Sequence, residues 1–272
     1  MISSNIQTDR RKTEVPSSNH PLLELEEVSK AFGGLMAVHH VSSQIKAGEI
    51  VALIGPNGSG KTTLFNLISG FLAPSKGEIR FQGRSLRGLA PHSIAALGIG
   101  RTFQVLQLFT NMSILENVMA GRHLRSRSGL LHTAFRLPPT REEEKSIFEM
   151  AMHHLTLVGL HREALDLPLS LPYGKQKLLE IARALATEPK LLLMDEPAGG
   201  LATHEIEHLA NLITRIRDSG ITILLVEHRM ELAMGIANRV IVLNFGEKIA
   251  EGTPAEVETN EEVIKAYLGE EF

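Results

Sequence analysis

The chain has 272 residues, of which 43% are apolar, with a formal net charge of −3 and no cysteine. Length and apolar content allow a sizeable core in one large domain or two closely packed ones. The near-neutral charge argues against nucleic acid as the main partner, and the absence of cysteine excludes disulfides, thiolate metal sites and cysteine nucleophiles.

The first segment, residues 1–21, is polar and has no apolar stretch of the kind that defines a secretory signal peptide. We expect it to be a disordered tail. No later run approaches the roughly 18 consecutive apolar residues that span a bilayer. The sequence therefore predicts a cytoplasmic protein that reaches a membrane only through a partner.

From Leu22 onward, short apolar runs alternate with helix-like segments, which is typical of a mostly parallel sheet flanked by helices. Three runs are predicted to be central strands because they are almost continuously apolar: Ile50–Ile54, Leu191–Met194 and Ile221–Val226. Each ends in a polar cluster. Since ligands bind beyond the carboxyl ends of such strands, three strands are expected to bring chemistry to one edge of the sheet.

A glycine-rich loop follows the first of these strands and opens a predicted helix over Lys61–Ile68. It matches the phosphate-loop pattern G-x-x-x-x-G-K-[ST], whose backbone N–H groups and helix N-terminus bind phosphate. Lys61 is expected to reach the β- and γ-phosphates of a nucleotide and Thr62 to ligate Mg²⁺. The predicted ATP-binding residues are Gly55, Pro56, Asn57, Gly58, Ser59, Gly60, Lys61, Thr62 and Thr63.

The region of about residues 106–172 has charged, helix-like stretches and few strand signals, so we expect an inserted helical subdomain there. After it, Asp195 and Glu196 end the second central strand. An Asp in this position can hold Mg²⁺ and an adjacent Glu can polarise water, although Asp-Glu-Pro also suits a surface turn. The end of the chain is predicted to form a strand from Glu247 and a helical appendage over about residues 252–272, with Gly252 and Pro254 in the turn between them.

Another motif, H-E-x-x-H at His204, Glu205 and His208, is the pattern of zinc metalloproteases. The same helix carries apolar residues at i, i+3, i+4 and i+7 from Ile206, so both histidines are expected on the opposite, solvated face. No nearby segment offers an evident third ligand or a shaped pocket. We therefore interpret the motif as an exposed helix surface.

Taken together, these motifs resemble the nucleotide-binding domain of ABC transporters over roughly Leu22 to Gly269. Longer phrases resemble the ATP-binding subunits of branched-chain amino acid importers: GIGRTFQ (Gly98–Gln104), ENVMAGRH (Glu116–His123), YGKQKLLEIARALAT (Tyr173–Thr187), LNFGEKIAEGTPAEV and AYLGEE. The resemblance implies a P-loop NTPase fold over residues 22–272, with a mostly parallel central sheet, an antiparallel β portion and the helical insert.

The same resemblance implies roles for single residues. Gln104 would sense Mg²⁺ and the attacking water while touching the membrane subunit, and His228 would contact the γ-phosphate. Phe32 would stack on adenine, since it supplies an aromatic face. The implied catalytic residues are Glu196, His228 and Gln104, and the implied Mg²⁺ ligands are Thr62, Gln104 and Asp195.

Two segments depart from the family pattern. Where the ABC signature usually reads L-S-G-G-Q, this chain has Leu171, Pro172, Tyr173, Gly174 and Lys175. Pro172 lacks the hydroxyl and the N–H that would face the nucleotide of an opposing subunit, although it suits the first turn of the following helix. In that helix Leu178, Ile181, Ala182 and Leu185 are predicted to face the core, and Lys175 adds a charge that would partly compensate for Pro172. Ala202 replaces an expected Asn or Asp and cannot form its cross-subunit hydrogen bond.

Because such ATPases work as head-to-tail pairs, an intact phosphate loop beside a weakened signature favours a heterodimer over a homodimer. The expected partners are transmembrane permease subunits, a second ATP-binding subunit and, indirectly, a periplasmic binding protein, with no nucleic acid. The chain would lie at the inner face of the cell membrane through the permease. The basic cluster Arg122, His123, Arg125 and Arg127 is expected to be a solvated loop or a contact to the permease or to lipid headgroups.

Three alternatives to branched-chain amino acid import remain open at the level of the sequence. The first is the ATPase of a related importer of urea, amides or other amino acids. The second is a soluble ABC ATPase acting on DNA or ribosomes; such proteins usually carry two nucleotide-binding domains in one chain or a long coiled-coil insertion, and this sequence shows neither. The third is a nucleotide-dependent scaffold with slow hydrolysis, which the altered signature favours and the intact Glu196 and His228 oppose.

Overall fold

The computed structural model describes residues 21–122 and 138–268. Its larger sheet has the strand order β10-β9-β3-β8-β7-β6. Neighbouring strands are parallel except for the pair β9 and β10. The strands are β3 (Ile50–Ile54), β6 (Ile99–Arg101), β7 (Leu191–Asp195), β8 (Thr222–Val226), β9 (Arg239–Asn244) and β10 (Glu247–Gly252).

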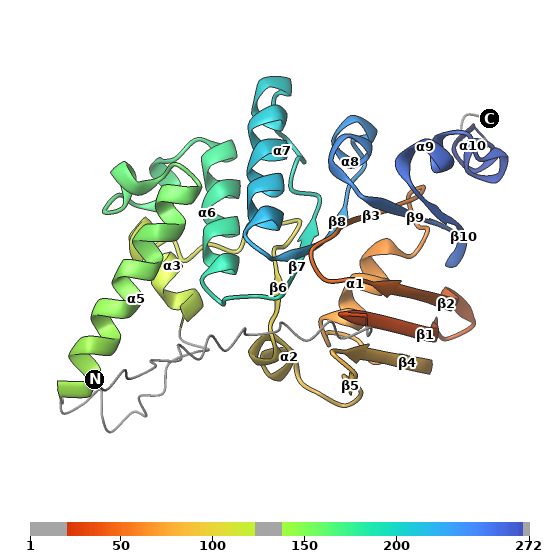
Figure 1. Ribbon diagram of the computed structural model, residues 1–272, viewed down its shortest axis with the longest axis horizontal. Coiled ribbons are helices and arrows are strands. Elements are labelled where there is room, and N and C mark those ends of the chain that lie inside the picture. Colours follow the sequence, from red (N-terminus) through yellow and green to blue (C-terminus); the bar gives the residue numbers. More distant parts are fainter. Residues whose placement is uncertain (1–20, 123–137, 269–272) are drawn as a thin grey trace, which may run out of the picture.

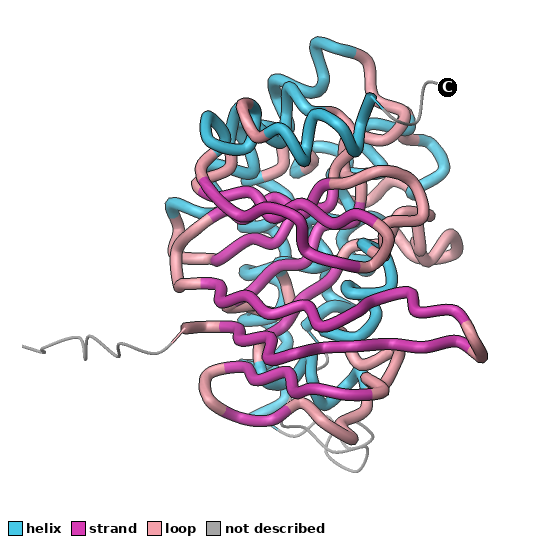
Figure 2. Tube along the Cα trace, turned by 90° about the vertical axis from the view of Figure 1, so that its right-hand side faces the viewer, coloured by secondary structure: helices cyan, strands magenta, loops and turns pink. Residues whose placement is uncertain are grey.

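The smaller sheet is antiparallel and has the order β2-β1-β4-β5. It consists of β1 (Leu23–Phe32), β2 (Leu35–Ile45), β4 (Lys76–Phe81) and β5 (Arg84–Ser85). Strands β1 and β2 form the long hairpin in the lower half of Figure 2. The fold class predicted from the sequence, a mostly parallel sheet with an antiparallel β portion and helical regions, is confirmed.

The helices divide into groups around these sheets (Figure 1). Helix α1 lies between the two sheets, α7 and α8 cover one face of the larger sheet, and α3, α5 and α6 stand together beyond its β6 edge. None of the described helices combines the length and the apolar character needed to cross a membrane. The helices are α1 (Lys61–Ile68), α2 (Pro91–Leu97), α3 (Ile114–Arg122), α5 (Pro138–Leu157), α6 (Tyr173–Leu185), α7 (Thr203–Asp218), α8 (Met230–Ile236), α9 (Pro254–Glu258) and α10 (Glu261–Leu268), with 3₁₀ turns at His161–Glu163 and Pro168–Ser170.

Strand β3 is fully buried because both of its faces are covered. Val51 and Leu53 pack in one cluster with Phe65 of α1, whereas Ala52 and Ile54 pack in another with residues of α8 and the C-terminal helices. The alternation follows from the two-residue period of a strand. A short strand held on both sides is a rigid support for the loop that leaves its carboxyl end.

The three central strands and the helix after the glycine-rich loop lie where the sequence predicts them, with ends that differ by at most one residue. Asp195 is the last residue of β7 rather than the first residue after it. Pro254 was expected in a turn, but it begins α9 because proline suits the first helical position. Helices α3 and α5 fall within residues 106–172, whereas residues 1–20 of the predicted tail lie outside the described residues.

Candidate functional site

The glycine-rich loop connects β3 to α1 and approaches β9 very closely. A Cβ atom at Gly55 would lie 2.0 Å from the carbonyl oxygen of Leu243, and one at Gly60 would lie 2.4 Å from the carbonyl oxygen of Ala37. Both glycines have positive φ angles, 147° and 101°. Only glycine fits these two positions, because any side chain would overlap the neighbouring backbone.

Lys61 is buried at the start of α1, and its side chain folds back over the loop. Its Nζ donates to the carbonyl oxygens of Gly55 and Pro56 at 2.6 and 2.7 Å and to the Ser59 hydroxyl at 3.3 Å. Thr62 follows on the exposed side of α1, and Thr63 is partly buried. The loop therefore places an ammonium group and a hydroxyl at one helix N-terminus, where the helix dipole favours anions.

Asp195 ends β7, which is separated from β3 by β8, and is almost fully buried. Its Oδ2 accepts a hydrogen bond from Nη2 of Arg101 at 3.1 Å, whereas its Oδ1 is buried and has no hydrogen-bond partner among the described residues. Burial raises the pKa of Asp195 above its ordinary value, and the Arg101 guanidinium opposes that rise. A buried carboxylate oxygen without a donor is costly unless a further group binds there.

Glu196 is held between the two other predicted catalytic residues. Its Oε1 lies 2.8 Å from Nε2 of His228, and its Oε2 accepts a hydrogen bond from Nε2 of Gln104 at 2.9 Å. Its backbone has a φ of 49° and its N–H donates to the carbonyl oxygen of Val226. A left-handed conformation is uncommon for a glutamate and aims this side chain away from the strand. The fold thus brings together three residues that are distant in the sequence.

Glu227 holds the backbone around this cluster and was not singled out by the sequence motifs. Its buried carboxylate accepts hydrogen bonds from the backbone N–H groups of Ala198, His228 and Arg229 at 2.7, 3.1 and 3.3 Å. Burial raises its pKa, and these three donors oppose the rise. Glu227 therefore fixes both the turn after Glu196 and the backbone of His228.

Two more buried charges come from α6 and were also missed. Lys177 donates to the carbonyl oxygens of Gln104 and Glu196 at 3.4 and 3.3 Å, and Glu180 accepts from the N–H of Phe103 at 3.1 Å. The helix thus holds the Gln104 loop against the end of β7. In the sequence, the only feature that could have indicated these roles is a Lys and a Glu three residues apart in an amphipathic helix. The same spacing equally fits a solvated helix face.

The predicted core stripe of α6 is confirmed. Ile181, Ala182 and Leu185 are buried, Leu178 is partly buried and packs against the same core cluster, and Leu179 is buried as well. Pro172 is the residue before the helix rather than part of its first turn. Lys177 and Glu180 are also buried, so the buried face of α6 is wider than the predicted stripe.

The altered signature segment lies at the start of α6. Leu171 is buried, whereas Pro172 and Tyr173 are exposed. The Lys175 ammonium forms an ion pair with Glu163, so the charge that was expected to compensate for Pro172 is engaged inside the chain. A Cβ at Gly174 would meet Oε1 of Glu205 at 2.3 Å.

The remaining predicted residues lie apart from this cluster. Phe32 is exposed at the tip of β1, with Nζ of Lys30 5.3 Å from its ring centroid. His204 and His208 are exposed on α7, and the described residues contain no group of three or more His, Cys, Asp or Glu placed to hold a metal. Of the basic cluster, Arg122 forms an ion pair with Glu188 at 2.5 Å. Residues 123–127, which include the other three members, lie outside the described residues.

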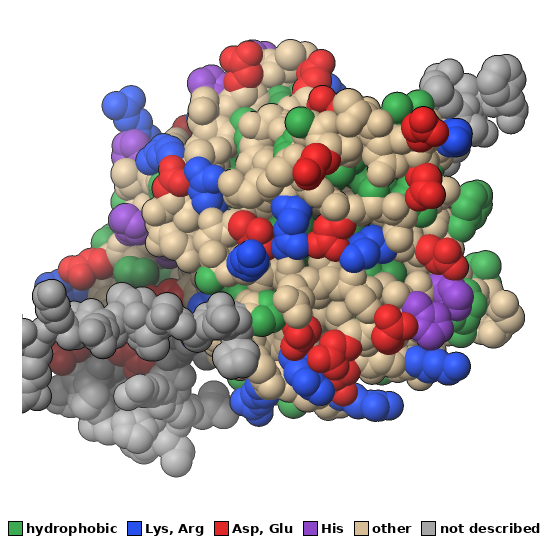
Figure 3. Space-filling model, turned by 45° about the vertical axis from the view of Figure 1, so that its right-hand side comes forward, with side chains coloured by type: hydrophobic (Ala, Val, Ile, Leu, Met, Phe, Trp, Pro, Cys, Tyr) green, Lys and Arg blue, Asp and Glu red, His purple; other side chains and the backbone are tan. Residues whose placement is uncertain are grey.

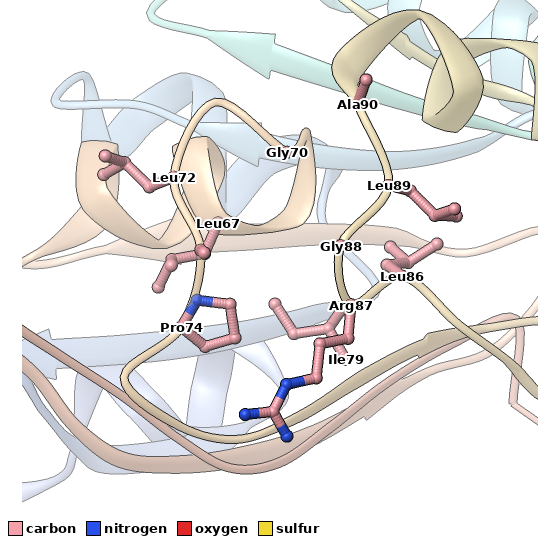
Figure 4. Close-up of a pocket in the computed structure, with 11 residues that line it drawn as sticks. Leu67, Gly70, Leu72, Pro74, Ile79, Leu86, Arg87, Gly88, Leu89 and Ala90 are labelled. Carbon is pink, nitrogen blue, oxygen red and sulfur yellow. The ribbon is translucent and has the colours of Figure 1, made fainter.

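Two hollows lie near the site. The smaller, of about 220 Å³, is at the far end of α1 from the glycine-rich loop; its walls are mostly apolar and Arg87 is its charged lining residue (Figure 4). The larger, of about 630 Å³, lies between the larger sheet and α3 and α6. Its lining includes three aromatic rings, Phe71, Phe103 and Phe109, together with the basic residues Arg101 and Arg183.

The surface charge of the chain is mixed. On the face seen in Figure 3, acidic and basic side chains are interspersed rather than separated into fields of one sign. Arg239, for example, pairs with both Glu49 and Glu251, and Lys248 pairs with Glu251. This face lacks the basic stripe that typically accompanies binding to a nucleic-acid backbone.

Comparison with known proteins places these features in a family. Residues 38–199 match the family described as ABC transporter, and residues 247–272 match the family described as branched-chain amino acid ATP-binding cassette transporter. The fold is similar to a crystal structure of the ADP conformation of an ATP-binding cassette of an ABC transporter, with 33% identity and a TM-score of 0.79, covering 91% of this chain and 98% of that one.

Curated relatives are similar along almost their whole length. The high-affinity branched-chain amino acid transport ATP-binding protein BraF of Pseudomonas aeruginosa is 42% identical over 93% of this chain and 99% of its own length. LivG of Escherichia coli strain K12, of the same description, has the same identity and coverage. The chain therefore belongs to the ABC transporter family, as an ATP-binding subunit and ATPase of the branched-chain amino acid (LivG/BraF) type.

Proposed function

We propose that this chain binds ATP with Mg²⁺ and hydrolyses it to drive the import of branched-chain amino acids. The observation that carries the proposal is the Glu196 carboxylate, held between Gln104 and His228 at the sheet edge that also carries the phosphate loop. The solute class is supported by relatives such as BraF and LivG, whose descriptions name branched-chain amino acid transport.

The nucleotide phosphates would lie over the glycine-rich loop. The Lys61 ammonium is already bonded to two loop carbonyls, and a triphosphate would draw it away because a charged partner gives a stronger hydrogen bond. The backbone N–H groups from Gly58 to Thr63 would supply the remaining donors. The exposed ring of Phe32 offers a stacking face for adenine.

A divalent cation fits the residues beside the loop. The buried Oδ1 of Asp195 has no donor among the described residues, and oxygen ligands of this kind suit Mg²⁺. Thr62, Asp195 and Gln104 would hold the ion, directly or through water. When bound, Mg²⁺ neutralises charge on the β- and γ-phosphates.

Hydrolysis would then depend on the Glu196 cluster. Glu196 would orient a water molecule in line with the γ-phosphate and accept its proton as the new P–O bond forms and the bond to ADP breaks. His228, within hydrogen-bond distance of Glu196, would contact the γ-phosphate, and Gln104 would hold the other side of the carboxylate.

The Glu196→Gln variant tests this assignment. The amide keeps the shape of the side chain but cannot accept a proton, so ATP hydrolysis by the assembled transporter should fall by about 100-fold or more, while ATP still binds. Glu26→Gln, at an exposed carboxylate of β1, should leave the rate unchanged. Turnover of Glu196→Gln near the parent rate would refute Glu196 as the principal catalytic carboxylate.

We further propose that the chain works as one half of a head-to-tail ATPase pair. A similar ATP-binding cassette, 28% identical with a TM-score of 0.73, is dimeric in a post-hydrolysis state with ADP and Pi. In such a pair the segment Leu171–Lys175 would face the partner's nucleotide with Pro172 in place of a donor and with Lys175 bound to Glu163. This arrangement favours a heterodimer with unequal sites.

The unequal-site proposal has a direct test in the reconstituted complex. Pro172→Ser combined with Ala202→Asn restores the missing hydrogen-bonding groups, so the site that contains this chain's signature should hydrolyse ATP faster. The measurement is the steady-state ATPase rate. No change in that rate would count against a weakened signature.

We propose that the larger hollow is the docking site for the permease subunit, which would hold the chain at the cytoplasmic face of the membrane. Its exposed ring Phe109 offers an apolar contact on the lining of the hollow. Phe109→Glu should reduce co-purification with the permease, whereas Phe148→Glu, at an exposed ring of α5 outside the hollow, should not. Equal co-purification of both variants would contradict this docking site.

In the assembled transporter, the permease and an external binding protein would select the solute.

A further inference from the structure

Arg101 and Asp195 form a buried ion pair between neighbouring strands. Only 9% of the Arg101 side chain and 3% of the Asp195 side chain are exposed. Nη2 of Arg101 donates to Oδ2 of Asp195 at 3.1 Å, and strands β6 and β7 run in parallel register here. A buried pair of this kind is sensitive to geometry because both charges are largely withdrawn from water.

The other end of the guanidinium reaches the helix that carries the phosphate loop. Nη1 of Arg101 donates to Oδ1 of Asn66 and to Oγ of Ser69, each at 2.7 Å. Asn66 belongs to α1 and Ser69 is its C-terminal cap residue. One planar fork thus ties Asp195 to α1, and a lysine, with a single nitrogen on a flexible stem, cannot reproduce this arrangement.

Three aromatic rings lie close to the guanidinium, which also lines the larger hollow. Its central carbon lies 5.9, 5.5 and 5.0 Å from the ring centroids of Phe65, Phe71 and Phe103. Phe71 and Phe103 pack edge to face and also line the larger hollow. These contacts favour the cation and restrict its side chain to one position.

We propose that Arg101 is a positioning residue for the magnesium carboxylate, which fixes Oδ2 of Asp195 and leaves Oδ1 free for the metal shell. The inference rests on the magnesium site proposed above. It follows from the division of the carboxylate: one oxygen accepts a hydrogen bond from the guanidinium, and the other is buried without a donor among the described residues. Partners that orient a metal ligand in this way contribute to metal affinity without touching the metal.

The experiment measures ATP affinity of the isolated subunit twice, in MgCl₂ and in EDTA, with a fluorescent ATP analogue as the probe. In Arg101→Lys the gain in affinity on adding Mg²⁺ should shrink by about tenfold, while the affinity in EDTA stays within about twofold of the parent. Arg239→Lys is the matched control, because it removes a forked Arg–carboxylate pair at the opposite end of β9 from the loop. It should retain the full magnesium gain.

A second variant, Phe103→Leu, keeps every hydrogen bond of Arg101 and removes one ring from the guanidinium, so it should lower the magnesium gain by about threefold. An unchanged gain in Arg101→Lys, or in Phe103→Leu if Arg101→Lys does not fold, would overturn the inference. An equal loss of affinity with and without Mg²⁺, accompanied by a lower melting temperature, would also overturn it, since that result would mean that Arg101 only stabilises the fold. A parent chain without any magnesium gain would instead refute the proposed magnesium site itself.

Discussion

Two glycines of the phosphate loop show that the cost of adding a side chain depends on how closely a neighbouring backbone approaches. Gly55 and Gly58 lie three residues apart in one loop, and both have positive φ angles. Their surroundings differ, because a Cβ at Gly55 would strike the carbonyl of Leu243, whereas a Cβ at Gly58 would meet nothing within 4 Å. The motif requires glycine at position 55 and leaves position 58 open, and of the two only Gly55 is held against another strand.

Alanine substitutions at these two glycines should therefore have unequal costs. Gly58→Ala should lower the free energy of unfolding by about 1–2 kcal/mol, the cost of a left-handed alanine. Gly55→Ala should cost about 3 kcal/mol or more, since the overlap with β9 is added to that strain. Urea unfolding of both variants measures the difference. Equal losses of unfolding free energy in the two variants would show that the backbones at Gly55 and Leu243 can move apart to make room for a Cβ atom.

Helix α5 carries a titratable group in an unusual place. His154 is buried beside α3 and α6, and neither of its ring nitrogens has a hydrogen-bond partner in the described part of the chain. Burial, reinforced by the neighbouring His153, lowers the pKa of His154 to about 4. The folded chain therefore holds this histidine neutral at a pH where the unfolded chain would protonate it.

The sign of the resulting pH dependence follows from this difference. Between pH 6.5 and about 4 the unfolded state binds the additional proton, so stability falls as the pH is lowered through this window. The contribution lost between pH 7 and pH 5 is about 2 kcal/mol. In His154→Leu that loss should disappear, and thermal melting at both pH values measures it. An equally large acid loss in the variant would assign the effect to other groups.

At the scale of the whole molecule, the sequence predicts most of the local elements but few of the side-chain contacts between distant segments. The phosphate loop, the three central strands and helix α1 follow from short patterns. The roles of Arg101, Lys177 and Glu227 do not, because each depends on partners supplied by other elements. From sequence alone a charged residue is predicted to face solvent, because only the fold shows which carbonyls and carboxylates surround it.

The same limit explains the signature helix. Its amphipathic period predicts the apolar core face correctly, but Lys177 and Glu180 are buried as well, where they bond to the backbone of Phe103, Gln104 and Glu196. Polar contacts thus widen the buried face of α6. Periodicity alone does not predict these contacts.

The proposed role of the assembled molecule is to couple ATP hydrolysis to the uptake of branched-chain amino acids. The most direct measurement is the ATPase rate of this chain in proteoliposomes with its permease subunits, partner ATPase and binding protein, with and without leucine. The rate should rise when leucine is added and should be lost in Lys61→Ala, which removes the ammonium from the phosphate loop. A rate that ignores leucine, isoleucine and valine, or that persists in Lys61→Ala, would contradict the account.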